Sequence, residues 1–125
     1  MYLIEYFFAS GIKILYIVMK KLYVFSDIHG ELLKLENLLS KLKISADDTL
    51  IFLGDYVDRG PDSCGVIELL LKLKEHYKCV FIKGNHDHVF FYDVLIHGKN
   101  LDKDNLGYWN EGAKEAFLSY RKRKI

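Results

Sequence analysis

Three short runs decide the fold of this chain: DIHG at residues 27–30, GDYVDRG at residues 54–60 and GNHD at residues 84–87. Each run follows a short apolar stretch rich in β-branched and aromatic residues, at positions 22–25, 50–53 and 80–82. These stretches are too short for helices and lack the polar alternation of half-exposed strands, so they predict buried parallel strands. Polar residues therefore stand where three neighbouring strands end.

The segments between the strands predict helices. Leucines recur at helical spacing through residues 32–42, and aliphatic residues do so through residues 66–73. The three motifs recur about every 30 residues, which is the length of a strand with its crossover helix. A right-handed βαβαβ unit follows, and in such units ligands gather beyond the carboxyl ends of the strands.

The residue types at these strand ends suit metal ions. Asp27 and His29 are two positions apart, so a strand continuing to His29 would place both on one side, as oxygen and nitrogen donors. The carboxylate of Asp55 can bridge two ions, and the amide oxygen of Asn85 can ligate the second. Two such ions can clamp a phosphoryl group and turn bound water into hydroxide near neutral pH. The pattern predicts a metal-dependent phosphoester site.

Three further motif residues suit phosphate binding and proton transfer. The planar fork of Arg59 can donate to two phosphate oxygens at once. His86 is placed to protonate a leaving alkoxide, and Asp58 can orient its imidazole. Taken singly, each loop is an ordinary turn and Arg59 an ordinary surface ion-pair partner. Only the three motifs together indicate catalysis.

In this order and spacing, the motifs resemble those of the calcineurin-like metallophosphoesterases. The Asp58-Arg59-Gly60 triplet resembles the serine/threonine phosphoprotein phosphatase branch, and WNEGA at 109–113 with LSY at 118–120 is similar to bacterial and phage members. The likeness runs from about residue 21 to 120. It implies an α/β fold in which this chain is the N-terminal βαβαβ part of a four-layer α/β/β/α sandwich, with the C-terminal half missing.

The resemblance also implies a role for each motif residue. The first metal would be held by Asp27, His29 and Asp55 and the second by Asp55 and Asn85, with Arg59 on the phosphate and Asp58 with His86 as the acid pair. Two divalent ions are expected, Mn²⁺ first, with iron or zinc as alternatives. Family members carry further histidine ligands downstream that residues up to Ile125 lack. An exposed sheet surface and an underligated second ion are expected, and with them a complementing chain or an oligomer.

Three functional hypotheses stay open at this point. The first is a phosphatase acting on phosphoserine or phosphothreonine in proteins. The second is a hydrolase of nucleotide polyphosphates such as diadenosine tetraphosphate. The third is an inactive fragment that binds a metal or a partner.

Composition and the chain ends give weaker expectations. With 18 basic and 17 acidic residues and a net charge of +1, nothing suggests a nucleic-acid partner. Cys64 and Cys79 are expected as free thiols in the cytoplasm. The apolar residues 1–18 make a poor signal peptide and a weak membrane anchor, so we expect an upstream or frayed extension before a domain at residues 19–125.

Three minor expectations complete the sequence analysis. Residues 121–124, with the sequence RKRK, should form the solvated end of a helix. Asp87 and His88 should cap the helix that follows them. Tyr56 and Tyr92 should serve packing more than substrate contact.

Overall fold

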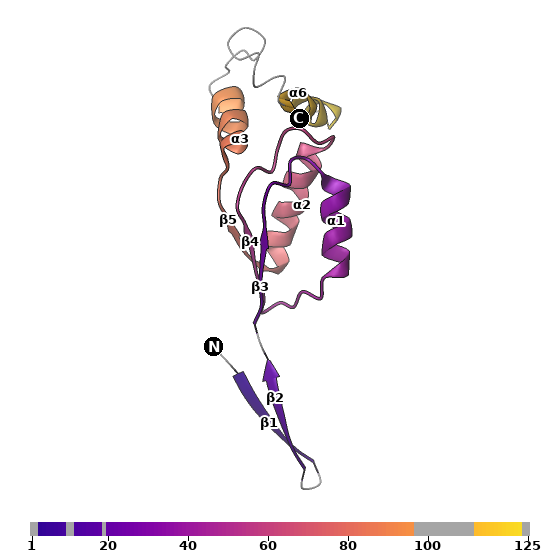
Figure 1. The fold of residues 1–125 in the computed structure, drawn as a ribbon, viewed down its shortest axis with the longest axis vertical. Coiled ribbons are helices and arrows are strands. Elements are labelled where there is room, and N and C mark those ends of the chain that lie inside the picture. The colour runs from indigo at the N-terminus through magenta and orange to yellow at the C-terminus, as the bar shows by residue number, and fades with distance from the viewer. Residues whose placement is uncertain (1–2, 10–11, 19, 97–111, 124–125) are drawn as a thin grey trace.

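The computed structural model describes residues 3–9, 12–18, 20–96 and 112–123 (Figure 1). Its body is a parallel sheet in the order β3-β4-β5, formed by β3 (Leu22–Phe25), β4 (Thr49–Phe52) and β5 (Lys78–Phe81). The crossovers contain α1 (Leu32–Lys41) and α2 (Ser63–His76). The predicted βαβαβ unit is confirmed. β3 has the predicted bounds, and the bounds of β4 and β5 differ from the predicted ones by one or two residues.

The two helices cover the same face of the sheet (Figure 1). Strands added in one direction through right-handed crossovers put both helices on one side. On that side, Phe25 stacks on Phe52 with ring centroids 4.9 Å apart, and Phe52 stacks on Phe81 at 5.2 Å. Leu50 and Phe52 are fully buried in this core. The helices therefore build a core on one side of the sheet.

The other face of the sheet is apolar and exposed. Leu22, Val24 and Val80 alternate with the core residues along their strands, and 68%, 57% and 47% of their surfaces are exposed. Side chains alternate between the two faces of a strand, so one face can be buried while the other faces outward. Nothing among the described residues of the sheet and helices buries these three side chains.

Beyond β5 the chain forms α3 (Asn85–Asp87), the π-helix η1 (His88–Ile96) and, after residues whose structure is not described, α6 (Lys114–Lys122). The expectation that Asp87 and His88 stand before the helix as its caps is wrong in position, although Asp87 does make a capping contact from inside the first turn. The helix begins at Asn85, because the motif itself forms the first turn. Asp87 lies within that turn and accepts a hydrogen bond from the Gly84 N–H at 2.9 Å.

The N-terminal segment is an antiparallel hairpin of β1 (Leu3–Ala9) and β2 (Ile12–Val18), paired from Leu3–Val18 to Ala9–Ile12. A regular hairpin thus replaces the frayed extension expected, in keeping with the preference of β-branched and aromatic residues for strands. Within the described ranges, no helix has the length and apolar character needed to cross a membrane. The domain boundary near residue 19 stays a proposal.

Candidate metal centre

Backbone hydrogen bonds hold the loop after β3 against the loop after β4. The Asp27 N–H donates to the Gly54 carbonyl at 3.3 Å, and the His29 N–H donates to the Asp55 carbonyl at 2.8 Å. The third loop passes equally close, since a Cβ placed on Gly84 would lie 2.5 Å from the Asp55 nitrogen. Only glycine permits this approach, so the three motifs meet at one edge of the sheet.

Asp27, His29 and Asp55 each offer one ligand atom, and these atoms all lie within 4.8 Å of one another. The His29 Nδ1 lies 2.9 Å from the Val57 carbonyl oxygen, which can only accept, so Nδ1 carries the proton. Nε2 is then left as the ligand atom, 3.9 Å from Asp27 Oδ1. This mixed oxygen and nitrogen set fits a divalent transition metal such as Mn²⁺, iron or zinc.

Asn85 stands beside the cluster at the start of α3, with an exposed side chain. The backbone N–H of the next residue, His86, donates to Asp55 Oδ1 at 3.1 Å. The third loop is therefore tied directly to a candidate metal ligand. The role of the Asn85 amide oxygen as a ligand of a second ion stays a prediction.

The proposed acid pair and the phosphate-binding arginine lie in contact. His86 Nδ1 is 2.8 Å from Asp58 Oδ2, and both side chains are buried. On the other side of the imidazole, Nε2 lies 3.4 Å from Nη2 of the exposed Arg59. The His86 ring also meets the His29 ring edge-on, with centroids 4.9 Å apart. The pair therefore adjoins the candidate metal ligands.

The backbone of the site is strained. In the described part of the chain, every non-glycine residue with a positive φ is a predicted site residue: Asp27 (53°), His29 (45°), Asp55 (55°), Asp58 (71°) and Arg59 (64°). Such left-handed residues cost on the order of 1–3 kcal/mol each and persist where surrounding contacts fix them. The strand ends at Phe25, so Asp27 and His29 meet through a turn and not through the strand alternation expected.

Asp87 is a site residue that the sequence analysis missed. Its buried carboxylate accepts hydrogen bonds from the backbone N–H groups of Asp55 at 2.7 Å, Tyr56 at 2.8 Å and Gly84 at 2.9 Å. It thereby fixes the second and third loops to each other. The only feature of the sequence that pointed to Asp87 was its place in the third motif, and the sequence analysis interpreted it as a helix cap.

Tyr56 serves packing, as expected. Its hydroxyl lies 3.0 Å from the Phe52 carbonyl and 2.5 Å from the Ile82 carbonyl, and burial raises its pKa to about 12. Cys64 and Cys79 are free thiols, which confirms that expectation. Burial raises the pKa of both thiols, so neither offers a ready nucleophile.

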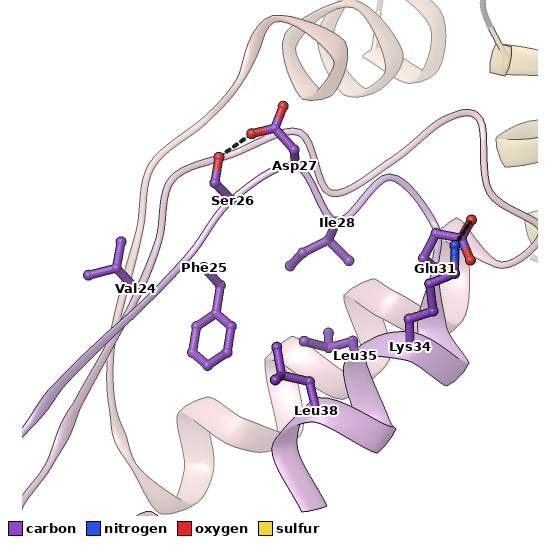
Figure 2. Close-up of a pocket in the computed structure, with 9 residues that line it drawn as sticks. All are labelled: Val24, Phe25, Ser26, Asp27, Ile28, Glu31, Lys34, Leu35 and Leu38. Atoms are coloured by element: carbon purple, nitrogen blue, oxygen red, sulfur yellow. Dashed lines mark hydrogen bonds and ion pairs between the residues drawn. The ribbon is translucent and has the colours of Figure 1, made fainter. Parts of the chain in front are cut away.

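A cavity of about 430 Å³ opens beside Asp27, between β3 and α1 (Figure 2). Its walls are mostly apolar, with Phe25, Ile28 and Leu35 among them, and Glu31 and Lys34 form an ion pair at 3.0 Å on its rim. The Ser26 hydroxyl donates to the Asp27 carboxylate at the near end (Figure 2). One end of the cavity therefore reaches a candidate metal ligand.

Comparison with known proteins finds relatives among phosphoester hydrolases. The chain is 39% identical over 75 residues to an asymmetrical bis(5'-nucleosyl)-tetraphosphatase of Oceanobacillus iheyensis, covering 53% of this chain and 30% of that protein. A symmetrical bis(5'-nucleosyl)-tetraphosphatase of Proteus mirabilis is 41% identical over 86 residues, with 67% and 30% covered. A putative serine/threonine-protein phosphatase of Caenorhabditis elegans is 38% identical over 66 residues, with 51% and 18% covered.

The chain thus spans less than a third of the length of these relatives. Residues 20–122 match the family described as calcineurin-like phosphoesterase, a range that includes all three motifs and α6. The chain therefore belongs to the calcineurin-like phosphoesterase family, and its sheet and helices correspond to the N-terminal part of that fold.

Proposed function

We propose that this chain carries the phosphate-cleaving site of a metal-dependent phosphoester hydrolase. The observation that supports it is the placement of the Asp27, His29 and Asp55 ligand atoms within 4.8 Å, next to the hydrogen-bonded Asp58–His86 pair. Asp27, His29 and Asp55 would hold one divalent ion, and Asp55 with Asn85 a second. Ions bound there lower the pKa of coordinated water toward neutrality and offset charge on phosphoryl oxygens.

The chain's own residues supply the proton and the phosphate contact. Asp58 accepts from His86 Nδ1–H and orients the imidazole, so that a proton on His86 Nε2 would be directed toward the leaving alkoxide. Arg59, exposed beside Nε2, would turn its guanidinium to two oxygens of the phosphoryl group. Acid and arginine would thus act on adjacent oxygens of one substrate.

For the substrate, we propose phosphoserine and phosphothreonine in proteins, on the resemblance of the Asp58-Arg59-Gly60 triplet. Dinucleoside tetraphosphates are the second candidate. They are favoured by the relatives named bis(5'-nucleosyl)-tetraphosphatases, which match 53% and 67% of this chain, against 51% for the phosphatase-named relative from Caenorhabditis elegans. The third candidate function is a chain that binds metal but hydrolyses neither substrate.

Calorimetry with Mn²⁺ followed by hydrolysis assays tests this proposal. Residues 1–125 should bind Mn²⁺, and Asp55→Asn should weaken binding because it removes the charge proposed to bridge two ions. Asp47→Asn, which changes an exposed carboxylate outside the motifs, is the matched control and should bind like the wild type. Unchanged affinity in Asp55→Asn would show that this residue only shapes a turn.

The substrate candidates separate in the second step. Mn²⁺-dependent release of phosphate from a phosphoserine peptide, with diadenosine tetraphosphate intact, supports the phosphoprotein assignment. Cleavage of diadenosine tetraphosphate into nucleotides, with the phosphoserine peptide intact, supports the nucleotide assignment. Metal binding with no turnover of either substrate, or of p-nitrophenyl phosphate, supports the binding module.

A further inference from the structure

We propose that residues 112–123, which are α6 with the two residues before it and Arg123 after it, form a positioning element for Arg59 that sets the affinity of the site for phosphate. The inference rests on the proposed role of Arg59 as the phosphate ligand. It concerns the later sequence stretch that resembles bacterial and phage relatives, to which the proposed chemistry gives no role. Residues 109–111 of that stretch lie outside the described residues.

The first contact is made to Arg59 itself. The Arg59 N–H donates to the Gly112 carbonyl at 3.1 Å, while the Arg59 backbone is left-handed with a φ of 64°. Gly112 has a φ of 109°, and a Cβ on it would lie 2.3 Å from the Arg59 nitrogen and 2.5 Å from its Cα. No side chain fits there, so glycine is required for the contact that fixes the strained arginine.

The second contact fixes the end of the same loop. The Cys64 N–H donates to Ser119 Oγ at 3.0 Å, and the Ser119 hydroxyl donates to the Ala116 carbonyl at 2.7 Å. Both Cys64 and Ser119 are buried. The serine hydroxyl therefore joins α6 to the first turn of α2, five residues after Arg59.

The third contact lies between these two. Arg123 Nη1 and Nη2 donate to Asp62 Oδ1 and Oδ2 at 2.6 and 2.9 Å, and its Nε donates to Glu68 Oε2 at 3.1 Å. This bidentate contact raises the pKa of Arg123 and lowers the pKa of Asp62. Asp62 also caps α2 by accepting from the Gly65 N–H at 3.0 Å. The expectation of a solvated basic end is therefore wrong for Arg123.

The loop from Arg59 to Cys64 thus lies between two supports. On the metal side, the Gly60 N–H donates to the His29 carbonyl at 2.8 Å and the Asp62 N–H to the Gly30 carbonyl at 3.0 Å. On the other side are the three α6 contacts. The metal ligands are joined by separate hydrogen bonds, such as His29 N–H to Asp55 carbonyl. Loss of an α6 contact should therefore displace Arg59 and leave the metal ligands in place.

The test measures inorganic phosphate binding to the Mn²⁺-loaded 125-residue chain by calorimetry. Gly112→Ala should weaken phosphate binding on the order of tenfold, the loss expected when one charge-assisted hydrogen bond is misplaced. Mn²⁺ affinity should stay within about twofold of the wild type, because the ligand loops keep their own contacts. Ser119→Ala and Arg123→Gln should act in the same direction and serve if Gly112→Ala does not fold. Arg121→Gln, exposed on the same helix, is the matched control.

Arg59→Ala separates this inference from the proposed function. If α6 acts through Arg59, then Gly112→Ala should cause no further loss of phosphate affinity in the Arg59→Ala background. An equal loss in both backgrounds, or a parallel loss of Mn²⁺ affinity, would overturn the positioning role. If Arg59→Ala alone leaves phosphate binding unchanged, the phosphate role of Arg59 fails and the inference fails with it. A loss in Arg59→Ala without one in the α6 variants overturns the inference alone.

Discussion

At the scale of single residues, Asp87 joins the second and third loops through three backbone N–H groups. Asp87→Asn keeps the shape but replaces one acceptor oxygen by a donor, so at least one buried N–H group loses its partner. We expect the free energy of unfolding to fall by about 1–3 kcal/mol. We also expect weaker Mn²⁺ binding, because the left-handed Asp55 loses a restraint.

Urea denaturation without metal and Mn²⁺ calorimetry measure the two effects separately. Asp47→Asn, at an exposed position, is the control for the change of charge. An Asp87→Asn variant with reduced stability but wild-type Mn²⁺ affinity would limit Asp87 to a structural role.

A second residue-scale prediction concerns the proposed acid. His86→Asn removes the group that protonates the leaving alkoxide, so hydrolysis of a phosphoserine peptide should slow by about 10²–10⁴. Hydrolysis of p-nitrophenyl phosphate should slow much less, because nitrophenolate leaves with little protonation. Comparing kcat for the two substrates checks this. Equal losses on both would contradict an acid role and point to a packing defect.

How far the site follows from the sequence is clear from its individual residues. Asp27, His29 and Asp55 could be predicted, since parallel strands end at one edge and metal ligands have a recognisable chemistry. The left-handed backbone could not be predicted, because most Asp and Arg residues have a negative φ, so their presence in a sequence does not indicate a positive one. The triple acceptor role of Asp87 depends on long-range contacts that no local pattern contains.

At the scale of elements, the joint between α6 and α2 should depend on pH. The Arg123 guanidinium lowers the pKa of Asp62 below its ordinary value of 3.8. Asp62 therefore binds protons more weakly when folded, and its contribution to stability is present above 3.8 and is lost as pH falls through the lower folded value. Because the pair is partly exposed, we expect about 1 kcal/mol at neutral pH.

Stability curves of the wild type and Arg123→Gln from pH 7 to pH 2 check this. The two curves should be separated at neutral pH and converge below 3.8 as Asp62 is protonated. A constant separation down to pH 2 would assign the effect to packing of the Arg123 side chain. Arg121→Gln should follow the wild type throughout.

The strands and helices with a regular pattern of apolar residues could be predicted from the sequence, and the other features could not. The strands and the helices α1 and α2 follow from apolar runs and helical spacing. The helix start at Asn85 was missed because the residue before it, Gly84, has no side chain that could signal a cap, and the capping contact comes from Asp87 inside the first turn. The role of Arg123 was missed because its partner Asp62 lies 61 positions away in the sequence.

At the scale of the whole molecule, the core lies on one side of the sheet. Phe52→Ala should cost about 3–5 kcal/mol, since the fully buried ring stacks on Phe25 and Phe81. Val80→Thr, on the exposed face of the neighbouring strand β5, should cost less than about 1 kcal/mol. Thermal or urea denaturation gives both values. A large cost for Val80→Thr would mean that the exposed face is covered in solution.

The five left-handed residues have a consequence for mutational tolerance. Asp and Asn visit positive φ several times more often than other non-glycine residues, and β-branched residues almost never do. A saturation library selected for folding alone, with neither metal nor substrate present, should therefore already reject Val, Ile and Thr at these positions. The requirements of folding alone would therefore mark these five residues of the proposed site, before any activity was assayed.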